Sequence, residues 1–179
     1  MDNCGFGRLR VKGSRATANC SRDNRLNSDE MAKTPHILVA EARYYVEIAD
    51  ELLKGATSVL SSSEATFEIA SVPGAFELPS VVRMAIESGG FDGYVTLGCV
   101  IRGETSHYDI VSGESARGLM FLSTEFGIAL GYGILTTETQ EQAWVRASRS
   151  GDNKGGMAAQ TCLEMVVARS KFGKGSVRG

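Results

Sequence analysis

Cysteine is scarce in this 179-residue sequence, and its four copies stand far apart. They occupy positions 4, 20, 99 and 162, which is the spacing of neither a disulfide framework nor a zinc site. This pattern favours a reducing, cytoplasmic compartment. The sequence also lacks any cluster of His, Cys, Asp and Glu with metal-ligand spacing, so we do not expect a metalloenzyme.

Other common features are missing as well. No apolar run approaches the length that spans a bilayer, so no membrane partner is expected. Lys and Arg number 19 against 21 Asp and Glu, and the resulting net charge of −2 argues against a nucleic-acid partner. No G-x-G-x-x-G motif follows the first predicted strand, which argues against a dinucleotide-binding enzyme.

Residues 1–30 differ in composition from the rest of the chain. Gly, Ser and Asn separate charged residues there, and the few apolar residues show no periodicity. This composition predicts a disordered N-terminal tail, with Met31 as a natural start before the first strand. The alternatives are an over-extended reading of the gene and an organelle transit peptide, which the acidic residues disfavour. Residues 31–179 are expected to form one domain with a substantial core.

Short apolar runs alternate with helical patterns from residue 36 onward. Strands are expected at 37–40, 67–72, 94–97 and 128–135, and helices at 43–61, from 78 to Gly89, at 110–126, after Thr139 through 147, and from 155. The helical periodicity places Met120 and Met165 in the core. Continuously apolar strands followed by helices predict an α/β fold, namely a flavodoxin-like three-layer α/β/α sandwich with a four-stranded parallel sheet.

The segment 97–109, LGCVIRGETSHYD, concentrates more chemistry than any other part of the chain. Its polar part is predicted as a loop between a strand and a helix, which is where open α/β sheets bind ligands. Backbone N–H groups ahead of a helix suit an anion. His107 in this loop can take up and release protons near neutral pH, the alternative being a surface histidine without a role. His36, at the start of a strand, is interpreted as having no role.

A phosphate in this loop would need a fixed cation. Arg146 and Arg149 are the candidates, although solvated arginines are common on helices. Tyr44 and Tyr132 could stack on a flat heterocycle or simply pack, and packing is the stronger interpretation for Tyr132 from the residues alone. Cys99 is expected to be a small buried thiol rather than a nucleophile.

Several segments, in this order and spacing, closely resemble the lumazine synthase family. They are ARY at 42–44, VPGAFELP at 72–79, LGCVIRGETSHYD at 97–109, GILTTE at 133–138 and NKGG at 153–156. The resemblance covers about residues 35–172. It implies the condensation of 5-amino-6-(D-ribitylamino)uracil with 3,4-dihydroxy-2-butanone 4-phosphate. The products are 6,7-dimethyl-8-ribityllumazine, phosphate and water, in the penultimate step of riboflavin biosynthesis, and neither a metal nor an organic cofactor is implied.

The resemblance also implies roles for individual residues. His107 would be the proton donor, and Tyr44 would stack on the pyrimidine. Arg146 would bind the phosphate, with Arg149 as the alternative because Ser150 stands where many relatives have Lys. Tyr132 would complete the site of a neighbouring subunit. The remaining substrate contacts would come from Ala75, Phe76, Glu77, Cys99, Val100, Ile101, Glu104, Thr105 and Lys154.

Membership of this family would make the protein a homo-oligomer with active sites between adjacent subunits. A pentamer, a decamer and a 60-subunit shell all remain open. An archaeal-type riboflavin synthase is one alternative, but its reaction does not need the phosphate-binding Thr105 and arginine. A non-catalytic flavin- or lumazine-binding paralogue is another, and the presence of His107 disfavours it.

Overall fold

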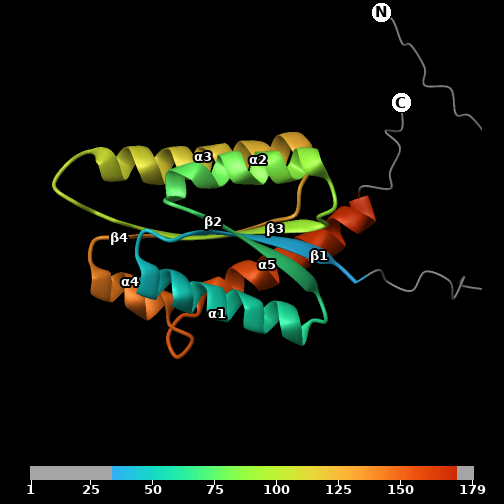
Figure 1. The fold of residues 1–179 in the computed structure, drawn as a ribbon, viewed down its shortest axis with the longest axis horizontal. Coiled ribbons are helices and arrows are strands. Elements are labelled where there is room, and N and C mark those ends of the chain that lie inside the picture. The colour runs from blue at the N-terminus through green and yellow to red at the C-terminus, as the bar shows by residue number, and fades with distance from the viewer. Residues whose placement is uncertain (1–33, 173–179) are drawn as a thin grey trace, which may run out of the picture. The chain divides into compact units, whose positions relative to one another are not determined.

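The computed structural model describes residues 34–172, so the predictions for residues 1–30 lie outside the described part. Strands and helices alternate along the described chain (Figure 1). They are β1 (His36–Ala42), α1 (Val46–Ser62), β2 (Thr66–Val72), a 3-10 turn η1 (Ala75–Glu77), α2 (Leu78–Ser88), β3 (Gly93–Ile101), α3 (His107–Phe126), β4 (Leu130–Thr137), α4 (Gln140–Ala147) and α5 (Lys154–Phe172). None of these helices combines the length and the apolarity needed to cross a membrane.

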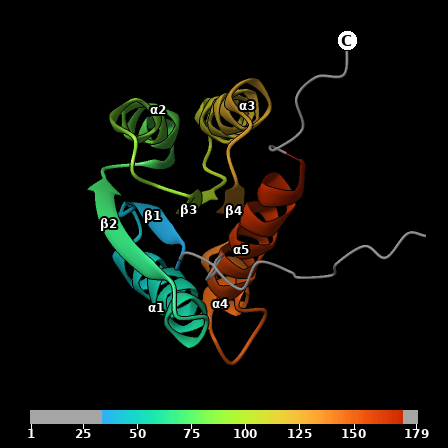
Figure 2. The same ribbon diagram turned by 90° about the vertical axis from the view of Figure 1, so that its right-hand side faces the viewer.

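The four strands form one parallel sheet in the order β2-β1-β3-β4. Helices α2 and α3 cover one face of the sheet, and α1, α4 and α5 cover the other (Figures 1 and 2). The predicted flavodoxin-like three-layer sandwich is therefore confirmed. Strand order reverses between β1 and β3, and open α/β sheets bind ligands beside such a reversal.

The core consists of two apolar clusters, one on each face of the sheet. Ile37 and Val39 pack with α1, α4 and α5, whereas Leu38 and Ala40 pack with α2 and α3. This alternation follows from the two-residue period of a strand. Two core predictions are wrong, because Met120 and Met165 are 63% and 42% exposed. Met120 follows the buried Leu119, and one residue of helical rotation turns its side chain away from the buried face.

The boundaries around the third strand also differ from the prediction. β3 continues to Ile101, four residues beyond its expected end, because residues 98–101 pair with 134–137 of β4. Gly98 lies within the strand, where an added Cβ would come within 3.2 Å of the Ala42 Cβ. α3 begins at His107 rather than Ile110. The connecting loop therefore contains only residues 102–106.

Helices α1 and α5 pack closely at Gly155. A methyl group there would overlap the backbone carbonyl oxygen of Leu52, which cannot move without shifting α1. We expect Gly155→Ala to lower the free energy of unfolding by about 1–3 kcal/mol, measured by denaturant unfolding. Gly113→Ala is the matched control, since nothing lies within 4 Å of its added methyl group. The control should be neutral or slightly stabilising, and equal losses in both variants would contradict the close packing.

Candidate active site

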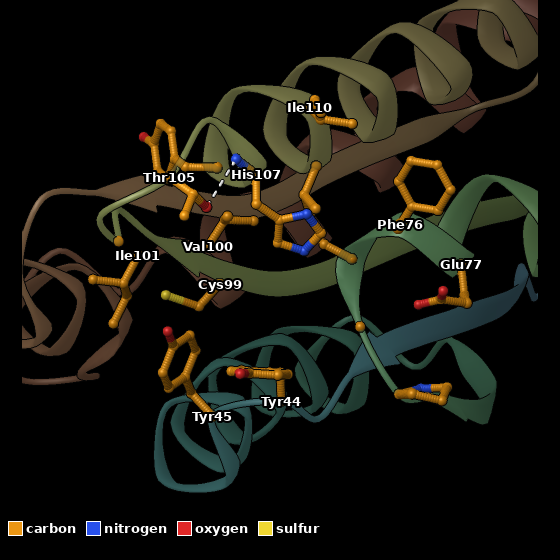
Figure 3. A pocket seen from close by; sticks show the side chains of 16 residues that line it. Tyr44, Tyr45, Phe76, Glu77, Cys99, Val100, Ile101, Thr105, His107 and Ile110 are labelled. Carbon is orange, nitrogen blue, oxygen red and sulfur yellow. Dashed lines mark hydrogen bonds between the residues drawn. The ribbon is translucent and has the colours of Figure 1, made fainter.

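A pocket of about 570 Å³ opens at the carboxyl ends of β1, β2 and β3 (Figure 3). Its walls come from the β1–α1 turn, the turn between β2 and α2, the end of β3 and the first turn of α3. Most of the residues expected at a substrate site line it, namely Tyr44, Ala75, Phe76, Glu77, Cys99, Val100, Ile101, Thr105 and His107. No group of three or more His, Cys, Asp or Glu suited to a metal ion is found within residues 34–172.

Four of the expected site residues do not line this pocket. Glu104 lies in the loop before α3, and Tyr132 lies on β4. Arg146 lies in the last turn of α4, and Lys154 is the first residue of α5. A single chain therefore brings together the apolar, aromatic and imidazole groups of the expected site, but not its two expected cations.

His107 is the first residue of α3 and not a loop residue as predicted. Its backbone N–H donates to Thr105 Oγ1 at 3.3 Å, and its imidazole points into the pocket (Figure 3). Because α3 starts here, Ile110 and Val111 lie on the same helix face as His107 and also line the pocket. Neither residue was predicted at the site, because the helix was expected to begin at Ile110, three positions later than it does.

Two adjacent tyrosines form the pocket wall on the β1–α1 turn. Tyr44 is 73% exposed and meets Tyr45 edge to face, with 4.9 Å between ring centroids. The hydroxyl end of Tyr45 points toward the Cys99 sulfur (Figure 3). Burial raises the pKa of Tyr45, and Tyr44 and Cys99 add to the shift. Tyr45 was not predicted as a site residue, although its position beside Tyr44, just before a helix, was an available signal.

Ion pairs around Arg43 hold this turn in place. Its guanidinium contacts Asp50 at 2.7 Å and both oxygens of Glu41 at 3.1 Å. Glu41 is only 2% exposed and also accepts a hydrogen bond from Ser71. The pKa of Arg43 is raised, mainly by its hydrogen bond to Asp50 and then by Glu41. Because the buried carboxylate is paired, the turn that carries Tyr44 is anchored without an isolated buried charge.

The prediction that Cys99 is a buried thiol is confirmed. It is 8% exposed, and burial raises its pKa to about 11, against a smaller lowering by Thr137. Since the thiolate is the nucleophilic form, this side chain remains a neutral thiol at physiological pH. Cys99 therefore contributes shape to the pocket and no acid–base or nucleophilic chemistry.

The two candidate phosphate-binding arginines have different surroundings. The Arg146 Nη1 donates to the carbonyl oxygen of Gln142 in its own helix at 2.9 Å. The Arg149 Nε lies 3.7 Å from a carboxylate oxygen of Glu51 on α1. Within residues 34–172 no carboxylate partner is recorded for Arg146. The Lys154 ammonium group donates to a weak acceptor, the Met157 sulfur, at 3.6 Å.

Tyr132 points from β4 toward the layer formed by α2 and α3. It is 42% exposed, and its neighbours at alternate positions, Leu130 and Ile134, pack in that layer. Burial raises the pKa of Tyr132, while a hydrogen bond with Ser115 opposes the rise. An aromatic ring that is half exposed and does not line this chain's pocket has surface left for contact with a second copy.

The pocket combines three chemical capabilities. Tyr44 and Phe76 offer aromatic surface to a flat heterocycle. The start of α3, beside Thr105, offers backbone N–H groups and the positive end of a helix dipole to an anion. His107 can carry a proton between groups bound at these two places.

Comparison with known proteins identifies the same chemistry. The profile of the 6,7-dimethyl-8-ribityllumazine synthase family matches residues 34–170. The chain is 50% identical over 145 residues to the 6,7-dimethyl-8-ribityllumazine synthase of Bartonella tribocorum, covering 80% of this chain and 96% of the relative. It is 49% identical over 146 residues to 6,7-dimethyl-8-ribityllumazine synthase 1 of Rhizobium meliloti, covering 79% and 95%. For the synthase of Methylobacterium radiotolerans the identity is 51% over 133 residues, covering 74% and 81%.

Proposed function

We propose, because this chain belongs to the 6,7-dimethyl-8-ribityllumazine synthase family, that its pocket condenses 5-amino-6-(D-ribitylamino)uracil with 3,4-dihydroxy-2-butanone 4-phosphate. Family membership makes the chain an enzyme that forms 6,7-dimethyl-8-ribityllumazine, with release of phosphate and water. The observation that carries the site assignment is that His107, Thr105, Phe76 and Tyr44 line one pocket although they come from three different segments.

The order of bond changes explains why so few groups suffice. The amine of the pyrimidine attacks the ketone, and loss of water gives an imine. Phosphate is then eliminated, which leaves an enol that becomes a second ketone, and attack of the ribityl-bearing nitrogen on this ketone, with loss of a second water, closes the ring. The first step needs the two reactants held in contact, and every step needs a proton added or removed. His107, at the pocket wall, is the group we assign to that proton transfer.

The two substrates are assigned to opposite sides of the pocket. The phosphate would lie at the start of α3, where Glu104 and Thr105 offer backbone and hydroxyl groups, with Arg146 as the cation. The pyrimidine would stack on Tyr44. The other contacts to the pyrimidine and ribityl side would come from Ala75, Phe76, Glu77, Cys99, Val100, Ile101 and Lys154.

One assay tests this function directly. The protein is mixed with both substrates, and lumazine absorbance and phosphate release are followed together. We expect the two products in equal amounts, and none when either substrate is omitted. Formation of riboflavin from lumazine alone would instead support a riboflavin synthase, and lumazine binding without turnover would support a non-catalytic paralogue.

Assembly of several copies is part of the proposal. The family forms homo-oligomers, and we propose a pentamer as the smallest active unit, with a decamer or 60-subunit shell built from it. Large apolar side chains such as Phe121, Trp144 and Val145 are 45–58% exposed in the single chain. Such exposure supports burial against another copy, and Tyr132 would then complete a neighbour's pocket.

A shared site predicts recovery of activity in mixed oligomers. Tyr132→Ala and His107→Ala should each lose most turnover, because each damages one half of every site. After subunit exchange some junctions pair an intact Tyr132 with an intact His107, so activity should return. The measurement is lumazine formation by the mixture against each variant alone. No recovery, once exchange has been demonstrated by labelling, would contradict a site shared between subunits.

The domain assignment and location complete the proposal. We propose that residues 31–179 carry the activity and that residues 1–30 do not contribute to it. The family profile starts at residue 34, which supports this division. We place the protein in the cytoplasm, as the widely separated cysteines suggest.

A further inference from the structure

Arg102 connects three elements beside the pocket without lining the pocket itself. Its Nη1 lies 3.1 Å from Asp109 Oδ1, in the first turn of α3. Its Nε lies 3.1 Å from a carboxylate oxygen of Glu138, directly after β4. The guanidinium carbon also lies 4.0 Å from the centroid of the Tyr108 ring. One side chain thus links the ends of two strands to the start of α3.

The backbone of Arg102 is fixed as well. Its N–H donates to the carbonyl oxygen of Thr137 at 2.9 Å, which extends the β3–β4 pairing by one residue. Arg102 therefore moves with the sheet, whereas Tyr108 and Asp109 move with α3. His107 stands directly before these two residues, and Thr105 lies in the loop between Arg102 and His107. Any shift of α3 against the sheet would displace both groups.

We propose that Arg102 is a positioning residue, whose guanidinium fixes the start of α3 on the sheet and so sets the places of His107 and Thr105. This inference rests on the proposed function, because it assigns Thr105 to the phosphate and His107 to the proton. The planar fork of Arg suits the task, since it pairs with two carboxylates and stacks on a ring at once.

Two other roles for Arg102 fit the geometry less well. As a source of stability it would contribute little, because its side chain is 39% exposed and exposed ion pairs are weak. As a direct phosphate ligand it would have to turn away from the two carboxylates that contact its Nε and Nη1. A displacement of about 1 Å at a reacting group can cost up to 10²-fold in rate, so positioning is where the larger effect is expected.

The test compares Arg102→Met with Arg117→Met in the full-length protein. Arg117 lies on α3 and, like Arg102, pairs with a carboxylate, that of Glu114, but it is 76% exposed and does not line the pocket. We expect Arg102→Met to lower kcat about tenfold and to raise the KM of the butanone phosphate a few-fold. The KM of the pyrimidine should remain within twofold, since Tyr44 and the turn after β2 are untouched. The control should match the wild type, and both variants should keep the wild-type oligomeric state.

Glu138, the carboxylate that pairs with Arg102 at the end of β4, supplies a second and independent test. Glu138→Gln should also lower kcat, and the double variant with Arg102→Met should be no slower than Arg102→Met alone, because both changes remove the same link. Arg102→Lys should recover part of kcat, since one ammonium group can replace one of the two ion pairs. Should Arg102→Met fail to assemble, the kcat of Glu138→Gln decides the question.

Several results would overturn the inference. Equal kinetics for Arg102→Met and Arg117→Met would remove the positioning role, and so would a wild-type kcat for Glu138→Gln. A KM increase of more than tenfold for the butanone phosphate at unchanged kcat would make Arg102 a phosphate ligand instead. If Arg102→Met lowered kcat/KM equally for both substrates and also changed the oligomeric state, the role of Arg102 would be structural. A wild-type protein without lumazine synthesis would refute the proposed function, which is a separate outcome.

Discussion

Replacing His107 with Ala should lower kcat by about 10²-fold and leave the KM of the butanone phosphate nearly unchanged. The side chain points into the pocket from the first residue of α3, and the proposed function places both substrates in this pocket. An imidazole holds a phosphate dianion much less firmly than a bidentate guanidinium does, so binding of that substrate should persist. Steady-state kinetics with each substrate varied in turn separates the two parameters.

The second histidine provides the matched control. His36 stacks on Phe91 and contacts Thr66 at 2.8 Å. It begins β1, so it lies at the amino ends of the strands, whereas the pocket lies at their carboxyl ends. His36→Ala should therefore keep the wild-type kcat. Equal losses in the two variants would indicate a general structural effect, and a large KM increase in His107→Ala would make His107 a phosphate ligand.

The fold could be predicted from the sequence because its main signals are local. Buried strands are short apolar runs, and helices carry an apolar stripe. The alternation of strands and helices along the chain, and hence a parallel sheet, could be predicted from these two patterns. The end of β3 could not be predicted in this way. Residues 98–101 stay in the strand because they pair with β4, which is more than 30 positions away in the chain. Pairing at that distance overrides the local preference of Gly98 to break a strand.

The same distinction applies to the pocket. Residues carried by the recognisable segments, such as Phe76 and Thr105, could be placed on its wall in advance. Ile110 and Val111 could not, because their orientation depends on where α3 begins. The contacts of Arg102 could not be predicted from the sequence either, since Asp109 and Glu138 approach it from two different elements. Sequence reasoning therefore supplied most of the pocket wall but not the groups that hold it in place.

Replacing Arg146 with Ala should raise the KM of the butanone phosphate by about tenfold or more. A charge-assisted, bidentate contact between guanidinium and phosphate contributes roughly 1.5–3 kcal/mol, which corresponds to that change. Arg146 is available for such a contact, because among residues 34–172 its guanidinium bonds only to the carbonyl oxygen of Gln142. Binding of the pyrimidine should remain nearly unchanged, as should its KM.

Arg149→Ala is the discriminating partner for this prediction. Arg149 already pairs with Glu51, which also binds Lys54, so turning it toward a phosphate would cost an existing ion pair. The pKa of Glu51 is lowered mainly by Lys54, and Arg149 adds to the same stabilisation of the carboxylate. Removing Arg149 should thus leave the KM of the butanone phosphate within about twofold, since one exposed ion pair contributes little. The opposite result, an intact KM in Arg146→Ala and a tenfold increase in Arg149→Ala, would make Arg149 the phosphate-binding residue.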